Sequence, residues 1–290
     1  IVLELLKYGA NVNLYSDNQT PLIAASGNME IVLELLKHGA DVNTKGRTTS
    51  PLIAACEFGH LNEVREFFKY KANANIKVSN DTPLIKACLF GNLDIVLELL
   101  ENGADTNITV SDKSPLIAAC SERHLEIVRN LLKYGAHINT TVSRKTALIE
   151  ACSSGCLDIV LELFKHGADV NITVSDSSPL IAACSQGHLS VVNELLKHGA
   201  NVTTHSVRHV SNMFNNLLSE ACFTGRSGIV NELLNHGADV NIKGLKGYPL
   251  TNACSAEKKD IVMILLKHGA DVNITDVYDE TPLIVACSSG

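Results

Sequence analysis

Cysteine is the residue type whose spacing in this chain most resembles a chemical site. The chain has 290 residues and nine cysteines. Eight of them recur at steps of 32, 33 or 38 residues, and these are Cys56, Cys88, Cys120, Cys152, Cys184, Cys222, Cys254 and Cys287. A regular ladder of thiols would suit a metal site or a redox-sensitive element. The ninth, Cys156, lies close to Cys152, but two thiols without further ligands make a poor zinc site.

If the recurring cysteines lie on stacked helices, their geometry argues against disulfide bonding. The axes of packed helices are roughly 8–10 Å apart, whereas a disulfide needs Cα atoms within about 7 Å. We therefore interpret the ladder as small, apolar core residues. A regulatory or redox element is the alternative, and slow reaction of the native thiols would argue against it.

Histidine recurs in a second register, immediately before a glycine. Its members are His38, His166, His198, His236 and His268. Other copies carry Tyr8, Tyr70, Tyr134 or Asn102 at this place. Exchange of His with Tyr and Asn suits helix capping and surface packing rather than metal ligation. The sequence also lacks Gly-x-Ser-x-Gly, a phosphate loop, His-Glu-x-x-His and Cys-x-x-Cys. We therefore predict no enzyme activity, no metal and no cofactor.

The elements that position these side chains come from an internal repeat. The phrase Thr/Ser-Pro-Leu-Ile, or a weaker copy of it, begins at residues 20, 50, 82, 114, 146, 178, 216 and 248, and again at 281. A second phrase, Gly-Ala-Asp/Asn-Val-Asn or a near copy, follows each complete copy. We predict a single array over residues 1–290, with partial repeats at 1–19 and 281–290. Because both ends cut through repeats, we expect it to be a fragment of a longer protein.

Each repeat has the pattern of two helices. Thr or Ser before Pro is a typical helix start, because the hydroxyl caps free amides and Pro suits the first helical position. The second helix has apolar residues at helical spacing, for example Ile159, Val160, Leu163 and Phe164. Lys and His in its last turn suit the helix dipole, and a Gly then provides a left-handed cap. One pair cannot bury both faces, so stability has to come from stacking.

These phrases resemble the ankyrin repeat, whose signature spans about 33 residues and includes Thr-Pro-Leu-His-x-Ala. Within one repeat, the phrases that begin at Thr82 and at Gly103 match it well, and the resemblance covers essentially the whole chain. It implies an all-α ankyrin-repeat solenoid of stacked helix-turn-helix units with short hairpin-like fingers. It also makes the finger-start asparagines candidates for hydroxylation, and these are Asn43, Asn107, Asn171, Asn241 and Asn273.

Several features depart from the ankyrin pattern. The family's His after Leu is Ile here, for example Ile53 and Ile85, which replaces a polar tie by burial. Most fingers are one residue short and lack the family's Asp-Gly turn. The first full repeat is two residues short in its first helix. Lys71 stands where a Gly cap is expected, and a left-handed non-Gly residue costs on the order of 1 kcal/mol. We expect a weak point in that repeat.

Composition narrows the function classes. The formal net charge is −7, which argues against non-specific nucleic-acid binding because that needs a basic face. No apolar run approaches the roughly 18 residues that span a bilayer, so we predict no direct membrane insertion. Nine cysteines would invite a search for disulfides in a secreted protein, but their repeat positions argue against disulfides, and we predict a cytoplasmic or nuclear protein. Aromatic residues make up 4% of the chain, so its core has to consist of Leu, Ile, Val and Ala.

Positions that vary between copies are the ones available for recognition. In the ankyrin family, partners usually lie along the concave face, against the finger tips and the outer part of the first helix. The corresponding register here holds Phe58, Leu89, Phe90 and Phe223. Exposed apolar clusters mark interaction sites, and aromatic residues are enriched in binding hot spots. The alternative is that these side chains fold inward against neighbouring helices.

Two further features of the variable positions favour binding. The fingers form a mostly basic edge, which an acidic segment of a partner would suit, although ordinary solvation of loop tips is the alternative. This edge comprises Lys45, Arg47, Lys77, Arg144, Lys145, Lys243 and Lys246. The seventh repeat starts six residues late, and such insertions map to loops. Met213 and Phe214 in this stretch either anchor a partner or cover a gap beside the irregular repeat.

The leading prediction is a scaffold or adaptor that binds another protein on the concave face and has no small-molecule substrate. The first alternative is a substrate-recognition or regulatory arm of a larger enzyme, channel or ubiquitin-ligase component. A nucleic-acid-associated module is a further alternative, which salt-dependent binding to nucleic acid would support.

Overall fold

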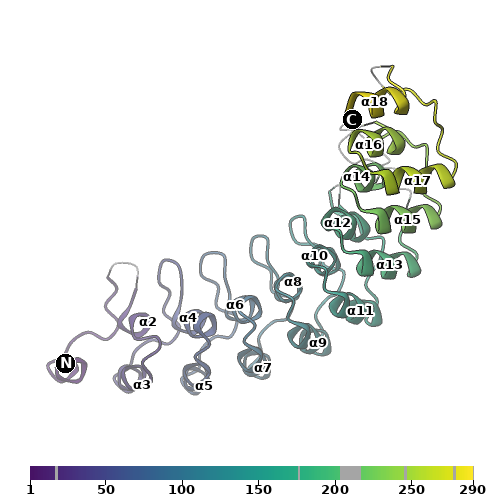
Figure 1. The fold of residues 1–290 in the computed structure, drawn as a ribbon. Coiled ribbons are helices and arrows are strands. Elements are labelled where there is room, and N and C mark those ends of the chain that lie inside the picture. The colour runs from purple at the N-terminus through teal and green to yellow at the C-terminus, as the bar shows by residue number, and fades with distance from the viewer. Residues whose placement is uncertain (17–18, 176, 203–216, 245–246, 277–278, 290) are drawn as a thin grey trace. The chain divides into compact units, whose positions relative to one another are not determined.

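The computed structural model describes residues 1–16, 19–175, 177–202, 217–244, 247–276 and 279–289. Over these ranges the chain forms eighteen helices, and its only β-structure is a set of isolated bridges (Figure 1). The all-α class expected from the sequence is confirmed. The chain divides into two compact units, residues 1–147 and 148–290.

The N-terminal unit has its helices in two rows (Figure 1). An inner row, next to the fingers, holds α2 (Pro21–Ala24), α4 (Pro51–Phe58), α6 (Pro83–Leu89) and α8 (Pro115–Ser121). An outer row holds α1 (Val2–Lys7), α3 (Met29–Lys37), α5 (Leu61–Lys69), α7 (Leu93–Glu101) and α9 (Leu125–Lys133). Each inner helix contacts its neighbours in the row and the outer helix that follows it in the chain. The core therefore lies between the rows.

The C-terminal unit repeats this arrangement. Its inner helices are α10 (Ala147–Ser154), α12 (Pro179–Gln186), α14 (Leu217–Phe223), α16 (Pro249–Ser255) and α18 (Pro282–Ser289). Its outer helices are α11 (Leu157–Lys165), α13 (Leu189–Lys197), α15 (Ser227–Asn235) and α17 (Lys259–Lys267). Contacts join α12 to α14, α14 to α16 and α16 to α18 along the inner row. Stability in both units comes from contacts between neighbouring pairs, as expected for a stack.

The inner helices begin where the Thr/Ser-Pro pairs predict. The Oγ of Ser50 accepts a hydrogen bond of 3.3 Å from the backbone N–H of Ile53, which satisfies one of the free amides of α4. The same bond occurs at Thr82, Ser114 and Ser178. Thr20 is the exception, because its Oγ1 is buried and has no hydrogen-bond partner among the described residues.

The recurring cysteines are core residues along most of the array. Cys56, Cys88, Cys120, Cys152, Cys184 and Cys222 are buried, as the sequence predicts. Burial decreases at the C-terminal end, where Cys254 is half-buried and Cys287 is exposed. The Ile that replaces the family's His is likewise buried in most repeats inside the array and exposed at its C-terminal end. Ile53 and Ile85 are fully buried, whereas Ile284 in the last helix is exposed, so burial does not compensate for the polar tie there.

The fingers close in turns of two residues. Val78 and Asp81 exchange backbone hydrogen bonds of 3.2 and 3.1 Å, and equivalent bridges join residues 110 to 113, 142 to 145 and 174 to 177. The first turn residue is a serine with positive φ, for example 52° at Ser79. The Ser79 hydroxyl also donates to the carbonyl of Arg47 in the preceding finger at 2.9 Å. A tight turn thus replaces the longer finger tip of the family.

The finger-start asparagines tie each repeat to the next. The Asn43 side chain accepts a hydrogen bond of 2.7 Å from the N–H of Asn73 and donates one of 3.1 Å to the carbonyl of Lys71. Asn75, Asn107, Asn171 and Asn241 make the same pair of bonds one repeat further on. Each asparagine therefore satisfies backbone groups that end the neighbouring outer helix.

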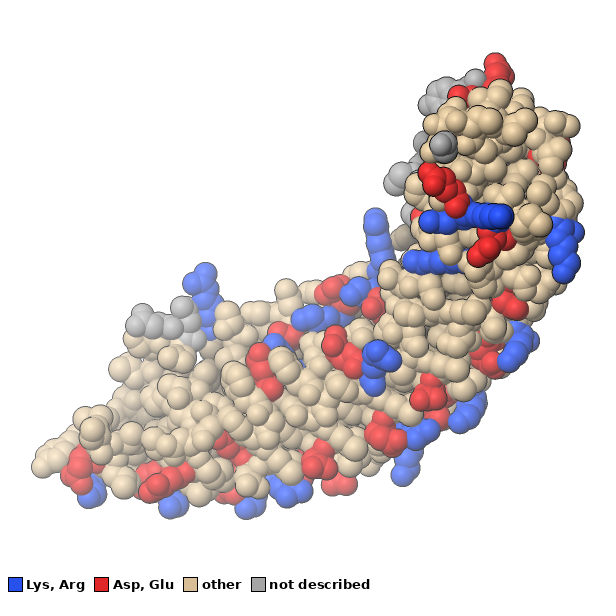
Figure 2. Space-filling model, in the orientation of Figure 1, with Lys and Arg blue, Asp and Glu red and all other residues tan. Residues whose placement is uncertain are grey.

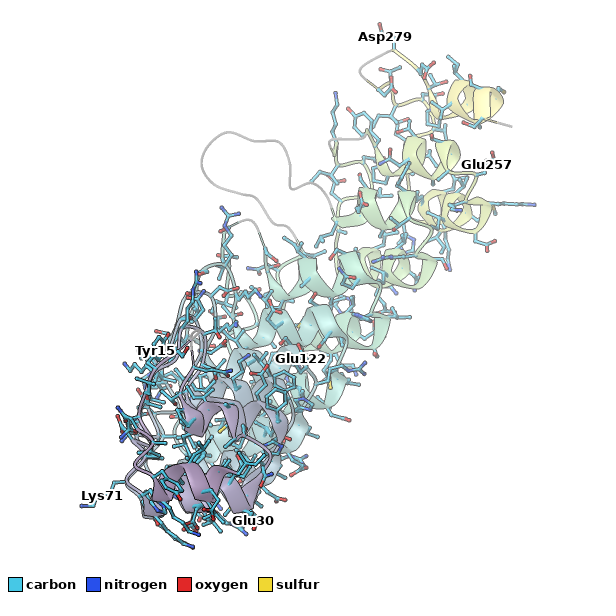
Figure 3. The ribbon with its side chains drawn as sticks, turned by 90° about the vertical axis from the view of Figure 1, so that its left-hand side faces the viewer. Tyr15, Glu30, Lys71, Glu122, Glu257 and Asp279 are labelled. Atoms are coloured by element: carbon cyan, nitrogen blue, oxygen red, sulfur yellow. The ribbon has the colours of Figure 1, made fainter. Side chains whose placement is uncertain are left out.

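Two of the irregular places in the sequence, the short first helix and Lys71, are also irregular in the structure. Helix α2 is half as long as α4, with four residues against eight. Lys71 follows α5 with a φ of 63°, where equivalent positions such as Gly103 are glycines with similar φ. Its side chain extends away from the helices at the edge of the unit (Figure 3). The left-handed conformation expected at Lys71 is thus confirmed.

Candidate functional site

The sequence-predicted aromatic residues of the N-terminal unit lie at the ends of two adjacent inner helices. Phe58 is the last residue of α4 and is 66% exposed, and Phe90 caps α6 and is 53% exposed. Neither ring folds inward against the core. Leu89 beside Phe90 is half-buried, so it supports the surface and contributes less to it. The two exposed rings occupy the same register of consecutive repeats and therefore face the same side of the stack.

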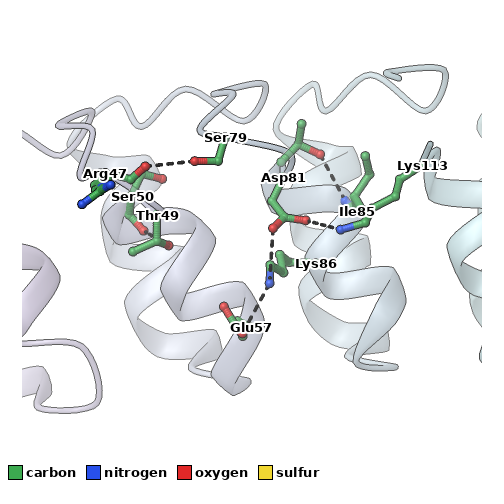
Figure 4. A network of polar contacts seen from close by, with 10 residues as sticks. Arg47, Thr49, Ser50, Glu57, Ser79, Asp81, Ile85, Lys86 and Lys113 are labelled. Carbon is green, nitrogen blue, oxygen red and sulfur yellow. Dashed lines mark hydrogen bonds and ion pairs between the residues drawn. The ribbon is translucent and has the colours of Figure 1, made fainter. Parts of the chain in front are cut away.

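Lys86 connects this aromatic pair to the fingers. Its Nζ lies 5.7 Å from the centroid of the Phe90 ring, within the range of a cation–π contact. The same Nζ lies 3.3 Å from a carboxylate oxygen of Glu57 and 3.4 Å from one of Asp81 (Figure 4). The side chain of Lys86 is only 17% exposed, so its charge is held in place by these three partners.

Asp81 extends the network to the next finger. One of its oxygens accepts from Lys113 Nζ at 3.1 Å, while the other faces Lys86 (Figure 4). Asp81 also closes its own finger through the backbone bridge to Val78. The chain of side chains thus runs from Glu57 through Lys86 and Asp81 to Lys113, with two positive and two negative charges. These four groups neutralise one another.

The finger cations outside this network are differently placed. Lys45, Arg47, Lys77 and Arg144 are exposed, Lys145 is half-exposed, and none of the five forms an ion pair within the described part of the chain. Lys77 Nζ makes a long hydrogen bond of 3.4 Å to the carbonyl of Thr109 in the next finger. These side chains leave positive charge on the finger edge of the N-terminal unit.

The outer helices carry a different pattern of charge. Figure 2 shows acidic and basic side chains alternating along the edge where α3, α5, α7 and α9 lie. Many of them are paired within one helix, such as Lys69 with Glu66 at 2.7 Å and Arg129 with Glu126 at 2.7 Å. Because these charges compensate each other locally, this edge offers little net field to a partner.

In the C-terminal unit the predicted residues are more scattered. Phe223 ends α14 and is 41% exposed. Lys243 lies 5.7 Å from the Tyr248 ring, so a finger cation contacts an aromatic side chain here as well. Met213, Phe214 and Lys246 lie outside the residues that the structure describes. The N-terminal unit therefore provides the better-defined candidate surface.

The histidines and thiols occupy structural positions. Nδ1 of His38, His198 and His236 lies 2.9 Å from the carbonyl oxygen four residues earlier, at the end of an outer helix. Burial raises the pKa of most of the recurring thiols, and it brings Cys222 to about 12. A thiol in such surroundings is a poor nucleophile at neutral pH. Across the described ranges, no group of three or more His, Cys, Asp or Glu side chains is placed to hold a metal.

Sequence reasoning missed Lys86 and Asp81. Lys86 occupies the variable position in Thr-Pro-Leu-Ile-Lys-Ala, where four of the nine copies have Ala, such as Ala54 and Ala118. That departure from a small residue was the available signal. Asp81 precedes the helix-capping Thr82, in a register that holds Lys113 and Lys145 in the next two repeats and is acidic again only at Glu280. Its role as the partner of both Lys86 and Lys113 depends on the tertiary structure, which brings the next finger beside it.

The fold and this surface define a helical repeat protein built of stacked helix-turn-helix units. A model of three ankyrin repeats matches residues 44–110, 107–174, 173–244 and 218–290, and a model of a single ankyrin repeat matches residues 17–47. The chain therefore belongs to the ankyrin-repeat family. Ankyrin repeats are generally protein-protein interaction modules and are typically not catalytic. No curated protein matches the sequence. None of the helices in the described ranges is long and apolar enough to cross a membrane.

Proposed function

We propose that this chain is a protein-protein interaction scaffold that binds its partner on the face formed by the inner helices and the fingers, which is the concave face of the family. The observation that carries this proposal is the pair Phe58 and Phe90, two exposed rings in one register of adjacent repeats. Large apolar side chains held at the surface mark interaction sites. The rest of that register is mostly small and polar, so the pair is specific to two repeats.

The surroundings of the pair support a binding surface that is held in place before the partner arrives. Lys86 is fixed by Glu57 and Asp81 and lies against Phe90. A side chain that is already ordered loses less conformational entropy on association. Aromatic hot spots commonly cost 2 kcal/mol or more when truncated, which is roughly a thirtyfold loss of affinity. We expect Phe58 and Phe90 to fall in this class.

Affinity capture from an extract of the source cells tests the proposal. The baits are the unaltered chain, the double variant Phe58→Ser/Phe90→Ser, and the control Tyr70→Ser/Tyr134→Ser. The control rings are 39% and 42% exposed but lie at the ends of the outer helices α5 and α9. All baits are first compared by thermal melting, so that only equally folded chains enter the experiment.

A protein that is retained by the unaltered chain and by the control, and lost from Phe58→Ser/Phe90→Ser, would support the proposed face. Loss from the control alone would move the binding site to the outer helices. Equal retention by all three baits would contradict the assignment to Phe58 and Phe90. A nucleic acid retained in place of a protein would favour the alternative module.

A further inference from the structure

We propose that the segment bound by the N-terminal unit is acidic and carries two bulky apolar side chains, which pack on Phe58 and Phe90 while its carboxylates face the fingers. This inference rests on the proposed interaction function and specifies the chemistry of the partner. Its basis is the distribution of compensated and uncompensated charge around the aromatic pair.

Two acidic groups close to the aromatic pair, Glu57 and Asp81, are already neutralised. Glu57 faces Lys86 at 3.3 Å, and Asp81 faces both Lys86 at 3.4 Å and Lys113 at 3.1 Å. These pairs link two consecutive repeats, and the side chain of Asp81 is only 16% exposed. Their fields therefore largely cancel at the surface, so they neither attract nor strongly repel a charged segment.

The fingers on the same unit keep an excess of positive charge. Across the four fingers between residues 44 and 146, the side chains without an ion pair are Lys45, Arg47, Lys77, Arg144, Lys145 and Asp112. Five of these six are cations, although the whole chain has a net charge of −7. Complementary charge on a partner would favour its encounter with this edge and its orientation along it.

Lys86 links the aromatic pair to the base of a finger. It contacts Asp81 at the base of that finger (Figure 4). It also lies over the ring of Phe90 at the far end of α6. It thereby spans the inner helix from finger to end. Equivalent positions on neighbouring helices are roughly 8–10 Å apart, and about three residues of extended chain cover that distance. A short segment therefore reaches both rings while its other side lies along the fingers.

The helix ends favour a polypeptide over a nucleic acid. Glu122 occupies the register of Phe58 and Phe90 in the following repeat and is exposed. A phosphate backbone stacked along this register would bring a negative charge at every nucleotide past Glu122. A polypeptide avoids this repulsion because its acidic and apolar side chains alternate in position. A segment with acidic side chains on one side and apolar side chains on the other therefore matches this surface.

A random peptide library displayed on phage provides the test, with the 290-residue chain as the immobilised bait. Selected peptides are synthesised and their affinities measured by fluorescence anisotropy at low and high salt. The charge variants are Lys45→Glu/Arg47→Glu and Arg144→Glu/Lys145→Glu, and the apolar variant is Phe58→Ser/Phe90→Ser. The control Lys69→Glu/Lys133→Glu makes the same change in net charge on the outer helices α5 and α9. A single-stranded RNA oligonucleotide is measured in parallel.

We expect the enriched peptides to be rich in Asp and Glu and to carry paired bulky apolar residues. Reversal of the finger cations should lower the affinity of these peptides for the chain at least tenfold, and added salt should lower it by a similar factor. The affinity of the control variant should stay within about twofold of that of the unaltered chain. Peptides without acidic bias that depend on Phe58 and Phe90 would overturn this inference and leave the proposed function standing. Selection of no peptide that depends on the aromatic pair would contradict both. RNA binding lost in the charge variants would overturn the inference in favour of nucleic acid.

Discussion

The Glu63 carboxylate accepts a hydrogen bond of 2.7 Å from the backbone N–H of Gly27, which lies in the preceding repeat. Glu63 is almost completely buried and stands in α5 where other outer helices carry Ile or Val, such as Ile95 and Ile127. Gly27 follows the shortened helix α2. The buried carboxylate therefore satisfies a backbone amide that directly follows the short helix.

Glu63→Ala should destabilise the chain because the Gly27 N–H loses its acceptor. A buried donor left unpaired costs about 1–3 kcal/mol, and the cavity adds to this. Glu63→Gln keeps an acceptor oxygen, so we expect a smaller loss. Urea unfolding followed by circular dichroism measures both. A Glu63→Ala chain as stable as the unaltered one would show that the bond to Gly27 contributes nothing.

Asn43→Ala should weaken the junction between two repeats. It removes the acceptor of the Asn73 N–H and the donor to the Lys71 carbonyl, each contributing about 0.5–1.5 kcal/mol. Asn62→Ala is the control, since Asn62 is exposed on α5 and alanine favours a helix. The free energy of unfolding is measured for both variants. Equal stability of Asn43→Ala and Asn62→Ala would contradict this role.

Lys71→Gly should stabilise the chain. Lys71 has a φ of 63°, and glycine adopts this conformation without the steric penalty of a Cβ, which is about 1 kcal/mol. Part of the gain is offset because glycine makes the unfolded chain more flexible. The reverse change, Gly103→Lys, places the same residue at the equivalent position and should be destabilising. A lower melting temperature for Lys71→Gly would refute the strain at this cap.

Labelling of native thiols should separate two groups. Cys287 is exposed and Cys156 is half-exposed, whereas Cys88 and Cys120 are fully buried. Burial raises the pKa of Cys88, so both access and thiolate formation are suppressed there. We expect iodoacetamide to modify Cys287 first and Cys88 only when the chain opens. Peptide mapping by mass spectrometry reads out the order, and fast labelling of Cys88 would revive the redox alternative.

The same burial predicts loss of stability at alkaline pH. The pKa of Cys184 is raised to about 12 by burial, with a smaller opposing effect from Arg226, and burial raises the pKa of Cys222 to about 12. The unfolded thiol has a pKa of about 8.5. The unfolded state therefore releases protons first as pH rises, and the stabilisation present below about pH 8.5 declines up to about pH 12. The urea midpoint of Cys222→Ala should fall less steeply over pH 8–11, and equal slopes would count against this linkage.

Much of the architecture follows from local patterns. Ser50 and Thr82 before Pro predict helix starts, and both make the expected cap. The recurrence of Cys56 and its equivalents predicts a small core position, and six of the eight are buried. These features are predictable because each repeat experiences nearly the same surroundings, so one local pattern has one structural meaning. The same residue takes a different environment near an end of the array, where Ile284 is exposed although its equivalents Ile53 and Ile85 are buried.

The candidate site was only partly predictable. The register of Phe58 and Phe90 marked a variable position, but an inward packing of the rings was an equal alternative. Whether such a ring is exposed depends on the space between two repeats, which no single repeat specifies. Lys86 was missed because its partners Glu57 and Asp81 come from separate elements that meet only in the stack.

By itself, the sequence determined the repeat, the two helices of each unit and the residues that recur to hold them, because these depend on capping, helical spacing and a repeated neighbour. Only the tertiary structure decided how the exceptions are accommodated. Glu63 meets Gly27 across 36 residues, and Lys86 joins a finger to Phe90, because stacking brings distant segments within hydrogen-bond and ion-pair distance. Such contacts depend on the shape of two adjacent repeats, and local spacing does not encode that shape.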